Sequence, residues 1–285
     1  MPDPHRPPRR LRSLPGQTAL VTGASGAFGS ATMALLRQLG VTAVGLDNQP
    51  GPGVIECDIT DEDQVKRAVG DALPRLGNRL DILIHYAGIG PAVDIGAMPD
   101  AAARQTMEVN LLGAWRVTSA ALPALQEARG RVILTASLLS GISLPFAGAY
   151  TVSKRALTAY ADMLRVEYGT HIDVTSVYPG YVDTAIHDRS RAAGVALDGL
   201  VPAEEVRDTV LTVLRTAAAR RPPRDTASTG LGNLGLRVSR HTPRAVERVV
   251  QLQVAALAQT RHFGDAPIAH GLYHRHDDAR QPIAR

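Results

Sequence analysis

The chain has few of the residues that build disulfide frameworks, membrane spans or nucleic-acid-binding surfaces. Its 285 residues include one cysteine, so an internal disulfide is excluded, which fits a reducing cytoplasm. No apolar run reaches the roughly 18 residues that a membrane helix needs. Aromatic residues make up only 4% of the chain, too few for a base-stacking surface. We therefore expect a cytoplasmic globular protein with no nucleic-acid partner and no stable membrane span.

Lysine is also scarce, because the 31 basic residues include only Lys66 and Lys154 and the rest are arginines. The arginines are scattered along the chain and the formal net charge is +4, which favours a solvated basic surface over a dedicated anionic partner. The first residues are rich in proline and arginine and lack the apolar segment of a secretion signal. Residues 1–15 are therefore predicted to form a disordered tail.

Short β-favouring runs alternate with helical stretches between residues 16 and 219. Such alternation predicts an α/β domain with a doubly wound parallel sheet, covered by helices on both faces. Within the long helical stretch, Pro123 is expected to kink or end the helix. The expected strands are 17–22, 41–47, 54–56, 80–85, 131–135 and 171–177, and the main helices are 31–40, 61–76, 104–128, 147–168 and 202–219.

Residues 220–285 are predicted to form a helical C-terminal extension outside this single domain. Arg244–Leu257 has amphipathic helical spacing, which favours a lid or a subunit contact, with membrane contact and disorder as alternatives. Residues 185–201 are interpreted as a loop or short-helix insertion. The last histidines, His270, His274 and His276, lie in a polar context next to a glycine, so we expect a flexible tail and no metal site.

A glycine-rich loop follows the first expected strand and opens the first expected helix. Glycines let the backbone approach a pyrophosphate, and the helix N-terminus then faces the anion. The second strand ends at Asp47, whose carboxylate is expected to bind ribose hydroxyls and repel a 2′-phosphate, which favours NAD over NADP. Asp58 and Ile59 follow the third strand, where Asp58 is interpreted as an adenine contact or a helix cap. The loop residues expected at the cofactor are Gly23, Ser25, Gly26, Ala27, Phe28 and Gly29.

Tyr150 and Lys154 are four residues apart, so they share one face of an expected helix. Chance alone would give such a pair in roughly 5% of chains of this composition, by counting seven tyrosines against two lysines. An ammonium group one turn away is expected to lower the tyrosine pKa toward the range of a proton-transfer catalyst. Ser137, on the loop after a strand, is expected to hold the substrate oxygen.

In this order along the chain, these motifs resemble those of the short-chain dehydrogenase/reductase family. The resemblance covers about residues 16–219 and includes the glycine motif, Asp47, Asp58-Ile59, Ala87-Gly88, Asn110 in the sequence NLLG, Ser137, Tyr150, Lys154 and Pro179–Thr184. It implies a Rossmann fold with a dinucleotide bound at one edge of the sheet.

The resemblance also implies roles for individual residues. Ser137, Tyr150 and Lys154 are implied to be catalytic, together with Asn110, which would hold a water of a proton relay to Lys154. Tyr150 and Lys154 would also touch the cofactor. The remaining implied cofactor contacts are Ala87, Gly88, Pro179, Gly180, Val182 and Thr184.

Two departures from the family pattern concern the cofactor side. Ala27 replaces the middle glycine of the usual motif, and the spacing Gly23, Gly26, Gly29 is that of the extended branch, which includes sugar-nucleotide epimerases. Tyr86 stands where an asparagine usually braces the sheet, so its hydroxyl needs another partner if it is buried, and we expect it to narrow the cofactor pocket.

The sequence thus predicts an NAD(H)-dependent oxidoreductase that interconverts a secondary alcohol and a ketone. Mostly apolar residues in 90–93, 138–146 and 187–200 favour a hydrophobic substrate such as a steroid, a terpenoid or a polyketide-like molecule. The family habit implies a homodimer or homotetramer formed through the helices near 104–128 and 148–168. The alternatives are an NAD-binding sensor or scaffold without turnover, and a sugar-nucleotide epimerase or dehydratase.

Overall fold

The computed structural model describes residues 11, 13–196 and 203–278. Seven parallel strands form one sheet in the order β3-β2-β1-β4-β5-β6-β7. The predicted doubly wound parallel α/β fold is confirmed. The strands are β1 (Thr18–Thr22), β2 (Thr42–Asp47), β3 (Val54–Glu56), β4 (Ile82–His85), β5 (Arg131–Thr135), β6 (Asp173–Tyr178) and β7 (Asp225–Ala227).

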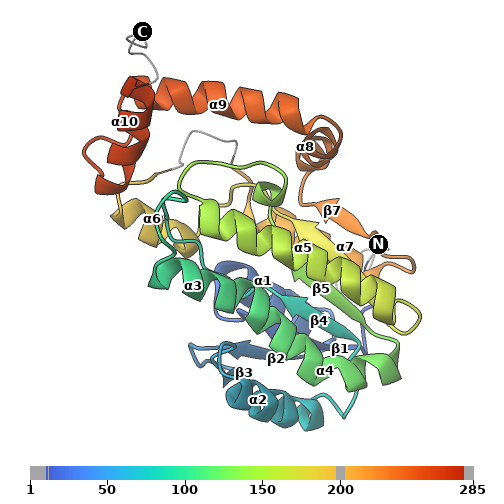
Figure 1. Cartoon of the computed structure of the whole chain (residues 1–285). Helices are drawn as coiled ribbons and strands as arrows, with labels where there is room; N and C mark the ends of the chain where they lie inside the picture. Colours follow the sequence, from blue (N-terminus) through green and yellow to red (C-terminus); the bar gives the residue numbers. More distant parts are fainter. Residues whose placement is uncertain (1–10, 12, 197–202, 279–285) are drawn as a thin grey trace, which may run out of the picture.

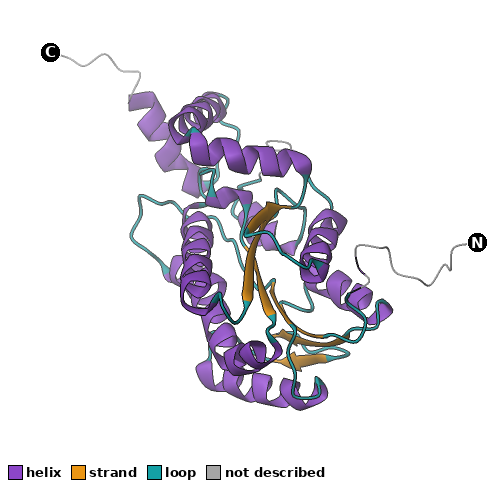
Figure 2. Ribbon diagram, turned by 90° about the vertical axis from the view of Figure 1, so that its right-hand side faces the viewer, coloured by secondary structure: helices purple, strands orange, loops and turns teal. Residues whose placement is uncertain are grey.

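Helices cover both faces of the sheet, which twists between them (Figure 2). Side chains of β1 alternate between the two layers: Leu20 packs in the cluster with α2, α4 and α5, whereas Ala19 and Val21 pack with α1 and α7. All five β1 residues are buried, as expected for a central parallel strand. The covering helices are α1 (Ala27–Gln38), α2 (Glu62–Arg75), α4 (Ala114–Ala128), α5 (Gly148–Tyr168) and α7 (Val206–Ala218).

The direction in which successive strands are added to the sheet reverses between β1 and β4. From β1, strands β2 and β3 extend the sheet to one side, and β4 to β7 extend it to the other. In open parallel sheets, ligands bind beyond the carboxyl ends of the strands at such a switch point. The topology therefore places the loops after β1, β2, β4, β5 and β6 along one edge of the sheet. Every predicted site residue lies in or beside this edge.

The domain boundary predicted at residue 219 is too early, because residues 225–227 of the predicted C-terminal extension form β7 of the sheet. Hydrogen bonds fix the segment that leads into β7. Arg165 on α5 donates to the Arg224 carbonyl at 2.8 Å, and Thr175 donates to the Pro223 carbonyl at 2.6 Å. Tyr178 donates to Asp225 at 2.9 Å. A three-residue strand containing an aspartate has no apolar pattern that reveals it in the sequence.

The N-terminal boundary also needs correction, because the core begins before residue 16. Leu11 and Leu14 are buried against α1 and α7, and the Ser13 hydroxyl donates to the Ala218 carbonyl at 2.8 Å. The predicted disordered tail therefore cannot extend to residue 15. The rest of that prediction, residues 1–10 and 12, lies outside the described residues.

The single long helix predicted over 104–128 is instead three segments. α3 (Ala101–Met107), capped by Asp100, leads into a π-helical turn at Glu108–Gly113, and α4 follows it. Pro123 lies inside α4 without ending it, since Val117 and Leu125 continue to pack into the core on either side. Turns of this π type are frequent at functional sites, and this one contains Asn110.

We call α8, α9 and α10 the C-terminal arm: α8 (Gly230–His241), α9 (Pro243–Gln259) and α10 (His270–Asp278). In Figure 1 the arm lies above the body, over the side of α5 and α6. The glycine-rich stretch forms helix α8, which the sequence did not predict. Thr229 caps this helix, because its side-chain oxygen accepts the Gly232 N–H. The expected amphipathic helix is confirmed as α9.

The arm joins the body through a small apolar cluster. Phe146 of the body meets Phe263 edge to face at 5.3 Å, and Val195 packs in the same cluster. The three histidines lie in helix α10 rather than in a flexible tail, because Tyr273 anchors that helix in the cluster and its hydroxyl accepts from the Phe263 N–H at 3.0 Å. Within the described residues, no helix has the length and apolar character needed to cross a membrane.

Short helices fill the predicted insertion after β6. A 3-10 turn at Ala185–His187 runs into α6 (Asp188–Ala192), so the part of this prediction that lies in residues 185–196 is confirmed. Residues 197–201 of the same prediction lie outside the described residues. A second 3-10 turn, Leu138–Ser140, follows β5, and a third at Pro267–Ala269 precedes α10.

Candidate active site

The glycine loop between β1 and α1 forms a cradle of bare backbone. Gly23 has a φ of +66°, and a Cβ there would lie 2.6 Å from the Ala87 nitrogen. A Cβ at Gly29 would overlap the Gly23 carbonyl oxygen. Gly26 occupies the N-cap of α1 with no side chain to satisfy the first N–H groups, so these remain available to an anion. Ala27, the departure from the family pattern, is exposed at the first helical position.

Asp47 faces this cradle from the end of β2. Its carboxylate accepts the Ser25 N–H at 2.9 Å and the Gln49 N–H at 3.0 Å, and Ser25 in turn donates its hydroxyl to the Gln49 carbonyl. The structure therefore brings Asp47 and the glycine loop together as predicted. The carboxylate lies where its charge would act on the sugar end of a nucleotide held by the loop.

Asp58 and Ile59 follow β3 at the same edge. Asp58 does not cap α2, because Asp61 does so by accepting from the Asp63 and Gln64 N–H groups. Asp58 instead accepts from the Thr60 N–H and hydroxyl at 2.9 and 2.8 Å. The side chain of Ile59 is buried beneath Gly113, so only its backbone is left to face a cofactor.

The hydroxyl of Tyr86 has the hydrogen-bond partner that its burial requires. Its OH lies 2.9 Å from the Thr32 hydroxyl, and its ring lies 5.7 Å from that of Phe28. Burial raises the pKa of Tyr86, so it remains a neutral phenol. Tyr86 and Phe28 together form a wall on the α1 side of the loop after β4, beside Ala87.

Tyr150 and Ser137 meet at the carboxyl end of β5. Ser137 is buried close to the Tyr150 hydroxyl, and its Oγ accepts from the Leu139 N–H at 3.1 Å. The predicted lowering of the Tyr150 pKa is wrong for this structure: burial raises the pKa to about 12, and only the nearby Ser137 hydroxyl acts in the other direction. Desolvation of the phenolate outweighs any benefit from the neighbouring ammonium.

Lys154 lies one turn beyond Tyr150 with its side chain inside the protein. Its Nζ donates to the Thr135 carbonyl at 2.8 Å and lies 5.7 Å from the centre of the Tyr150 ring. Burial lowers the Lys154 pKa to about 8. A lysine with this pKa exchanges protons near neutral pH, which a solvated lysine does not.

His85 is a neighbour of the site that no sequence motif revealed. It is buried at the end of β4, its Nε2 lies 2.9 Å from the Thr118 hydroxyl, and its Nδ1 lies 3.4 Å from that of Thr22. Burial and the charge of Lys154 lower the His85 pKa to about 3, so the ring is neutral at physiological pH. A lone buried histidine in an apolar strand gives no sequence signal beyond its type.

Asn110 projects from the π-helical turn toward the same point. Its side-chain amide donates to the Ile89 carbonyl at 2.9 Å and to Ser153 Oγ at 2.9 Å, and its oxygen accepts the Ile89 N–H at 2.8 Å. A Cβ at Gly88 would lie 3.3 Å from both Asn110 Oδ1 and Lys154 Nζ. The structure thus places Asn110 near Lys154, a pair that the resemblance linked through a water, with the Gly88 backbone beside both.

The loop Pro179–Thr184 follows β6 at the same edge of the sheet. Val182 is buried, and His187 Nε2 lies 3.1 Å from the Val182 carbonyl oxygen. Glu204, which no motif revealed, braces this loop: its carboxylate accepts the Gly180 N–H at 2.9 Å and the Thr229 hydroxyl at 2.8 Å. The loop is thereby tied to the start of α8.

A small cavity of about 40 Å³ lies above Tyr150. Residues from all three predicted substrate-facing segments line it, and among the described residues no arginine or lysine does so. The wall is mainly apolar, with His187 and Ser190 as polar exceptions. The lining residues are Gly90, Ala92, Leu139, Pro145, Phe146, Ala147, Tyr150, Ile186, His187, Ser190 and Val195.

Sequence comparisons agree with this geometry. The family model described as short chain dehydrogenase matches residues 17–194. A dehydrogenase/reductase SDR family member 7B of Xenopus laevis is 37% identical over 184 residues, which cover 60% of this chain and 54% of that protein. A 3-ketodihydrosphingosine reductase of Bacteroides thetaiotaomicron is 30% identical over 179 residues, covering 60% of this chain and 66% of that protein. The aligned part thus spans between half and two thirds of these relatives.

Solved structures are similar over more of the chain. A short chain dehydrogenase from Burkholderia cenocepacia, in complex with NADP, is 28% identical with a TM-score of 0.72, covering 84% of this chain and 99% of that one. An aldohexose dehydrogenase from Thermoplasma acidophilum is 22% identical with a TM-score of 0.67, covering 79% of this chain and 95% of that one, a likeness of fold alone.

Proposed function

Because this chain belongs to the short-chain dehydrogenase family, and is thus an oxidoreductase with a nucleotide-binding Rossmann fold, we propose that it interconverts a secondary alcohol and a ketone with NAD(H). The observation that carries this proposal is the convergence of Ser137, Tyr150 and Lys154 at the carboxyl end of β5, beside the glycine cradle. The presence of all three of these residues also argues against an NAD-binding sensor without turnover, because such a protein would not need them.

The residues at the carboxyl ends of the strands fit a bound dinucleotide. The cradle of Gly23, Gly26 and Gly29 leaves room that a Cβ would fill, and unpaired N–H groups face it. When bound, the nicotinamide would supply or accept a hydride at the substrate carbon. We assign the pyrophosphate to the glycine loop and the nicotinamide to the loop after β6. The proposed contacts are Gly23, Ser25, Gly26, Ala27, Phe28, Gly29, Asp47, Asp58, Ile59, Ala87, Gly88, Tyr150, Lys154, Pro179, Gly180, Val182 and Thr184.

In the direction of ketone reduction, Tyr150 donates its proton to the carbonyl oxygen as that oxygen gains charge. Ser137 holds the same oxygen by donating a second hydrogen bond. Lys154 then stabilises the phenolate and returns a proton to it, a role suited to its lowered pKa. Asn110 is assigned to hold the water that links Lys154 to solvent, next to the Gly88 backbone.

NAD is the proposed cofactor because the Asp47 carboxylate lies at the glycine loop, where it accepts the Ser25 N–H. A 2′-phosphate placed there would meet like charge, whereas ribose hydroxyls would donate to the carboxylate. The similar Burkholderia structure holds NADP. The proposed preference of this chain for NAD therefore rests on Asp47.

The proposed substrate is hydrophobic, because the wall above Tyr150 is mainly apolar. Relatives named for lipid-like substrates include the 3-ketodihydrosphingosine reductase and an 11-beta-hydroxysteroid dehydrogenase-like protein of Arabidopsis thaliana. A cavity of about 40 Å³ is far smaller than a site for such a molecule, which is typically about 300 Å³ or more. We infer that the arm acts as a lid, and that it moves with Phe146 and Val195 when substrate enters.

We further propose a homodimer or homotetramer in the cytoplasm. The long helices α4 and α5 expose large apolar side chains, among them Trp115 at 50% and Val166 at 79%, which is the expected condition of a subunit contact. Cys57 is buried and free, which suits a reducing compartment. Sedimentation velocity of the wild type against Val166→Asp tests the contact, since the change should shift the oligomer toward monomer.

The deciding experiment follows NADH absorbance with a panel of steroid, terpenoid and long-chain ketones. We expect turnover with at least one ketone, and loss of it in Tyr150→Phe. Tyr160→Phe is the matched control, because Tyr160 lies on the same helix but stacks on Trp115, away from Ser137. NADH binding without turnover across the panel, or equal activity of both variants, would overturn the proposal.

A further inference from the structure

Helix α9 lacks the packing that the other long helices have. Of its 17 residues only Ala258 is buried, although the helix carries valines and leucines on two faces. Val246, Val250 and Val254, spaced one turn apart, are half-buried and line a cavity of about 700 Å³ between α9 and the body. Elements of one chain are normally close-packed, so an open space of this size between α9 and the body, lined by both apolar and polar side chains, has the character of a ligand site.

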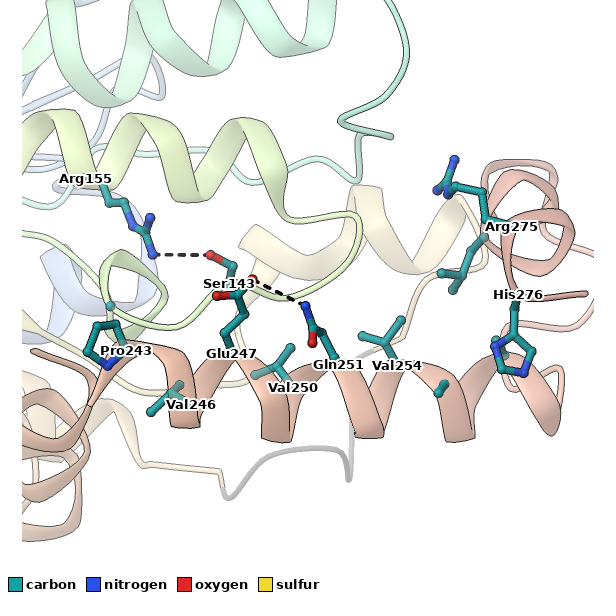
Figure 3. A pocket seen from close by; sticks show the side chains of 14 residues that line it. Ser143, Arg155, Pro243, Val246, Glu247, Val250, Gln251, Val254, Arg275 and His276 are labelled. Atoms are coloured by element: carbon teal, nitrogen blue, oxygen red, sulfur yellow. Dashed lines mark hydrogen bonds between the residues drawn. The ribbon is translucent and has the colours of Figure 1, made fainter. Parts of the chain in front are cut away.

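The cavity is a long groove, which Figure 3 shows from the side with α9 as its floor. Pro243 lies at one end and Ala258 near the other, so the floor is about 22 Å long from the rise of an α-helix. The opposite wall includes Gly141 and Ser143. We call this space the α9 groove. Its shape suits an extended hydrocarbon chain better than a compact ring system.

The two ends of the α9 groove differ in charge and in hydrogen bonding. At the Pro243 end, Arg155 is already engaged, donating to the Ser140 carbonyl at 2.7 Å and to Ser143 Oγ at 3.3 Å, and Glu247 adds negative charge. At the α10 end, Arg275 and His276 line the groove, and the His276 Nε2 is buried without a hydrogen-bond partner. An anion is therefore disfavoured at the first end and favoured at the second.

Arg275 is only loosely held in its present position. Its guanidinium is 3.8 Å from the Asp94 carboxylate, too far for a direct hydrogen bond, and 60% of its side chain is exposed. It is free to turn toward an acceptor placed beside His276. A buried polar atom without a partner costs free energy, and an anionic acceptor at this point would remove that cost while gaining a charge-assisted bond.

We propose that the α9 groove binds a single-chain amphiphile with an anionic head group, such as a long-chain carboxylate. The chain lies along Val246, Val250 and Val254, and the head group accepts hydrogen bonds from Arg275 and His276. This site is separate from the cavity above Tyr150, because the segment 141–146 stands between them. Bound amphiphile would supply the packing that α9 lacks.

The opposite face of α9 provides the matched control. Val249 is 56% exposed and Leu252 is 68% exposed, and neither lines the groove. A membrane surface or a second copy of the chain would contact this outward face, whereas the proposed ligand contacts Val250. Neighbouring positions of one helix thus separate the groove from these other occupants.

The test titrates oleate, below its critical micelle concentration, into the full chain by calorimetry. We expect one site per chain, and an affinity that falls steeply with shorter chains such as octanoate and by about tenfold or more for oleyl alcohol, which lacks the charge. Val250→Trp, which fills the groove, should abolish binding. Val249→Trp should leave it unchanged, and Arg275→Gln should weaken it by about tenfold.

Far-ultraviolet circular dichroism, which needs neither the groove nor a cofactor, shows whether each variant is folded and keeps this test separate from that of the proposed function. Equal oleate affinity of Val250→Trp and wild type in folded proteins would overturn the proposal. So would equal binding of oleate and oleyl alcohol. Binding only to phosphatidylglycerol vesicles, lost in Val249→Asp, would point to a membrane surface instead, and self-association lost in that variant would point to a second copy.

Discussion

Helices α5 and α9 are both long, yet they are held in opposite ways. Eight residues of α5 are buried, including Lys154 and Leu157, so the body fixes the helix on several sides. α9 has one buried residue, Ala258, which lies near its C-terminal end and packs in the cluster with Phe146 of the body. The chemistry is placed on the rigid helix, where geometry must be exact. The arm has the loose packing expected of an element that opens or accommodates a ligand.

The largest expected effect on turnover comes from changing Lys154, which lies on the firmly packed helix α5. Lys154→Met removes the group that stabilises the Tyr150 phenolate, so turnover should fall by about a hundredfold or more. The chain supplies a matched control in its only other lysine, since Lys66 is solvent-exposed and pairs with Glu62 at 2.6 Å. Steady-state kinetics of both variants check this, and similar losses in the two would remove Lys154 from the mechanism.

The difference in packing predicts a difference in stability. Leu157→Ala leaves a cavity in a close-packed region and should lower the free energy of unfolding by about 2–4 kcal/mol. Val250→Ala removes two methyl groups that face the α9 groove and should cost less than about 1 kcal/mol without ligand. Urea unfolding of both variants measures the contrast. A cost at Val250 as large as that at Leu157 would show that α9 is as firmly packed as α5.

The acid stability of the body should depend on His85. Its pKa in the folded protein is lowered to about 3, so below pH 6.5 the unfolded chain binds a proton that the folded one does not. Stability due to this group is complete above about pH 6.5 and is lost as pH falls, by roughly 2 kcal/mol at pH 5.

His85→Gln should flatten this part of the pH dependence, as measured by chemical unfolding at several pH values. The exposed His171 is the control, because His171→Gln should leave the slope as it is. An unchanged slope in His85→Gln would mean that the ring is already protonated or solvated in the folded protein.

The smallest predicted effect is on cofactor choice. Asp47→Asn keeps the shape of the side chain but removes the charge beside Ser25, so the ratio of kcat/KM for NAD to that for NADP should fall by about tenfold. Competition kinetics with both cofactors check it. The same change leaves the arm untouched, so oleate binding should not respond, and a joint loss would indicate that the body and the arm are coupled.

The sequence predicted the sheet edge well because its parts are local. Gly23, Asp58 and Ser137 come just after a strand and Asp47 ends one, and parallel strands bring their carboxyl ends together whatever the loops do. It did not predict β7, α8 or the role of Glu204, since each depends on contacts between segments far apart in the chain. Arg165, for instance, holds the Arg224 carbonyl across 59 residues.

What the sequence determined by itself is the α/β alternation, the glycine cradle and the helical spacing that puts Tyr150 and Lys154 on one face. These follow from backbone periodicity and residue type alone. Only the tertiary structure decided the ionisation of the site, because burial raises the pKa of Tyr150 and lowers that of Lys154, and burial is not a property of a residue in its sequence. It also decided that α9 stands over an open groove, since packing depends on every neighbouring element at once.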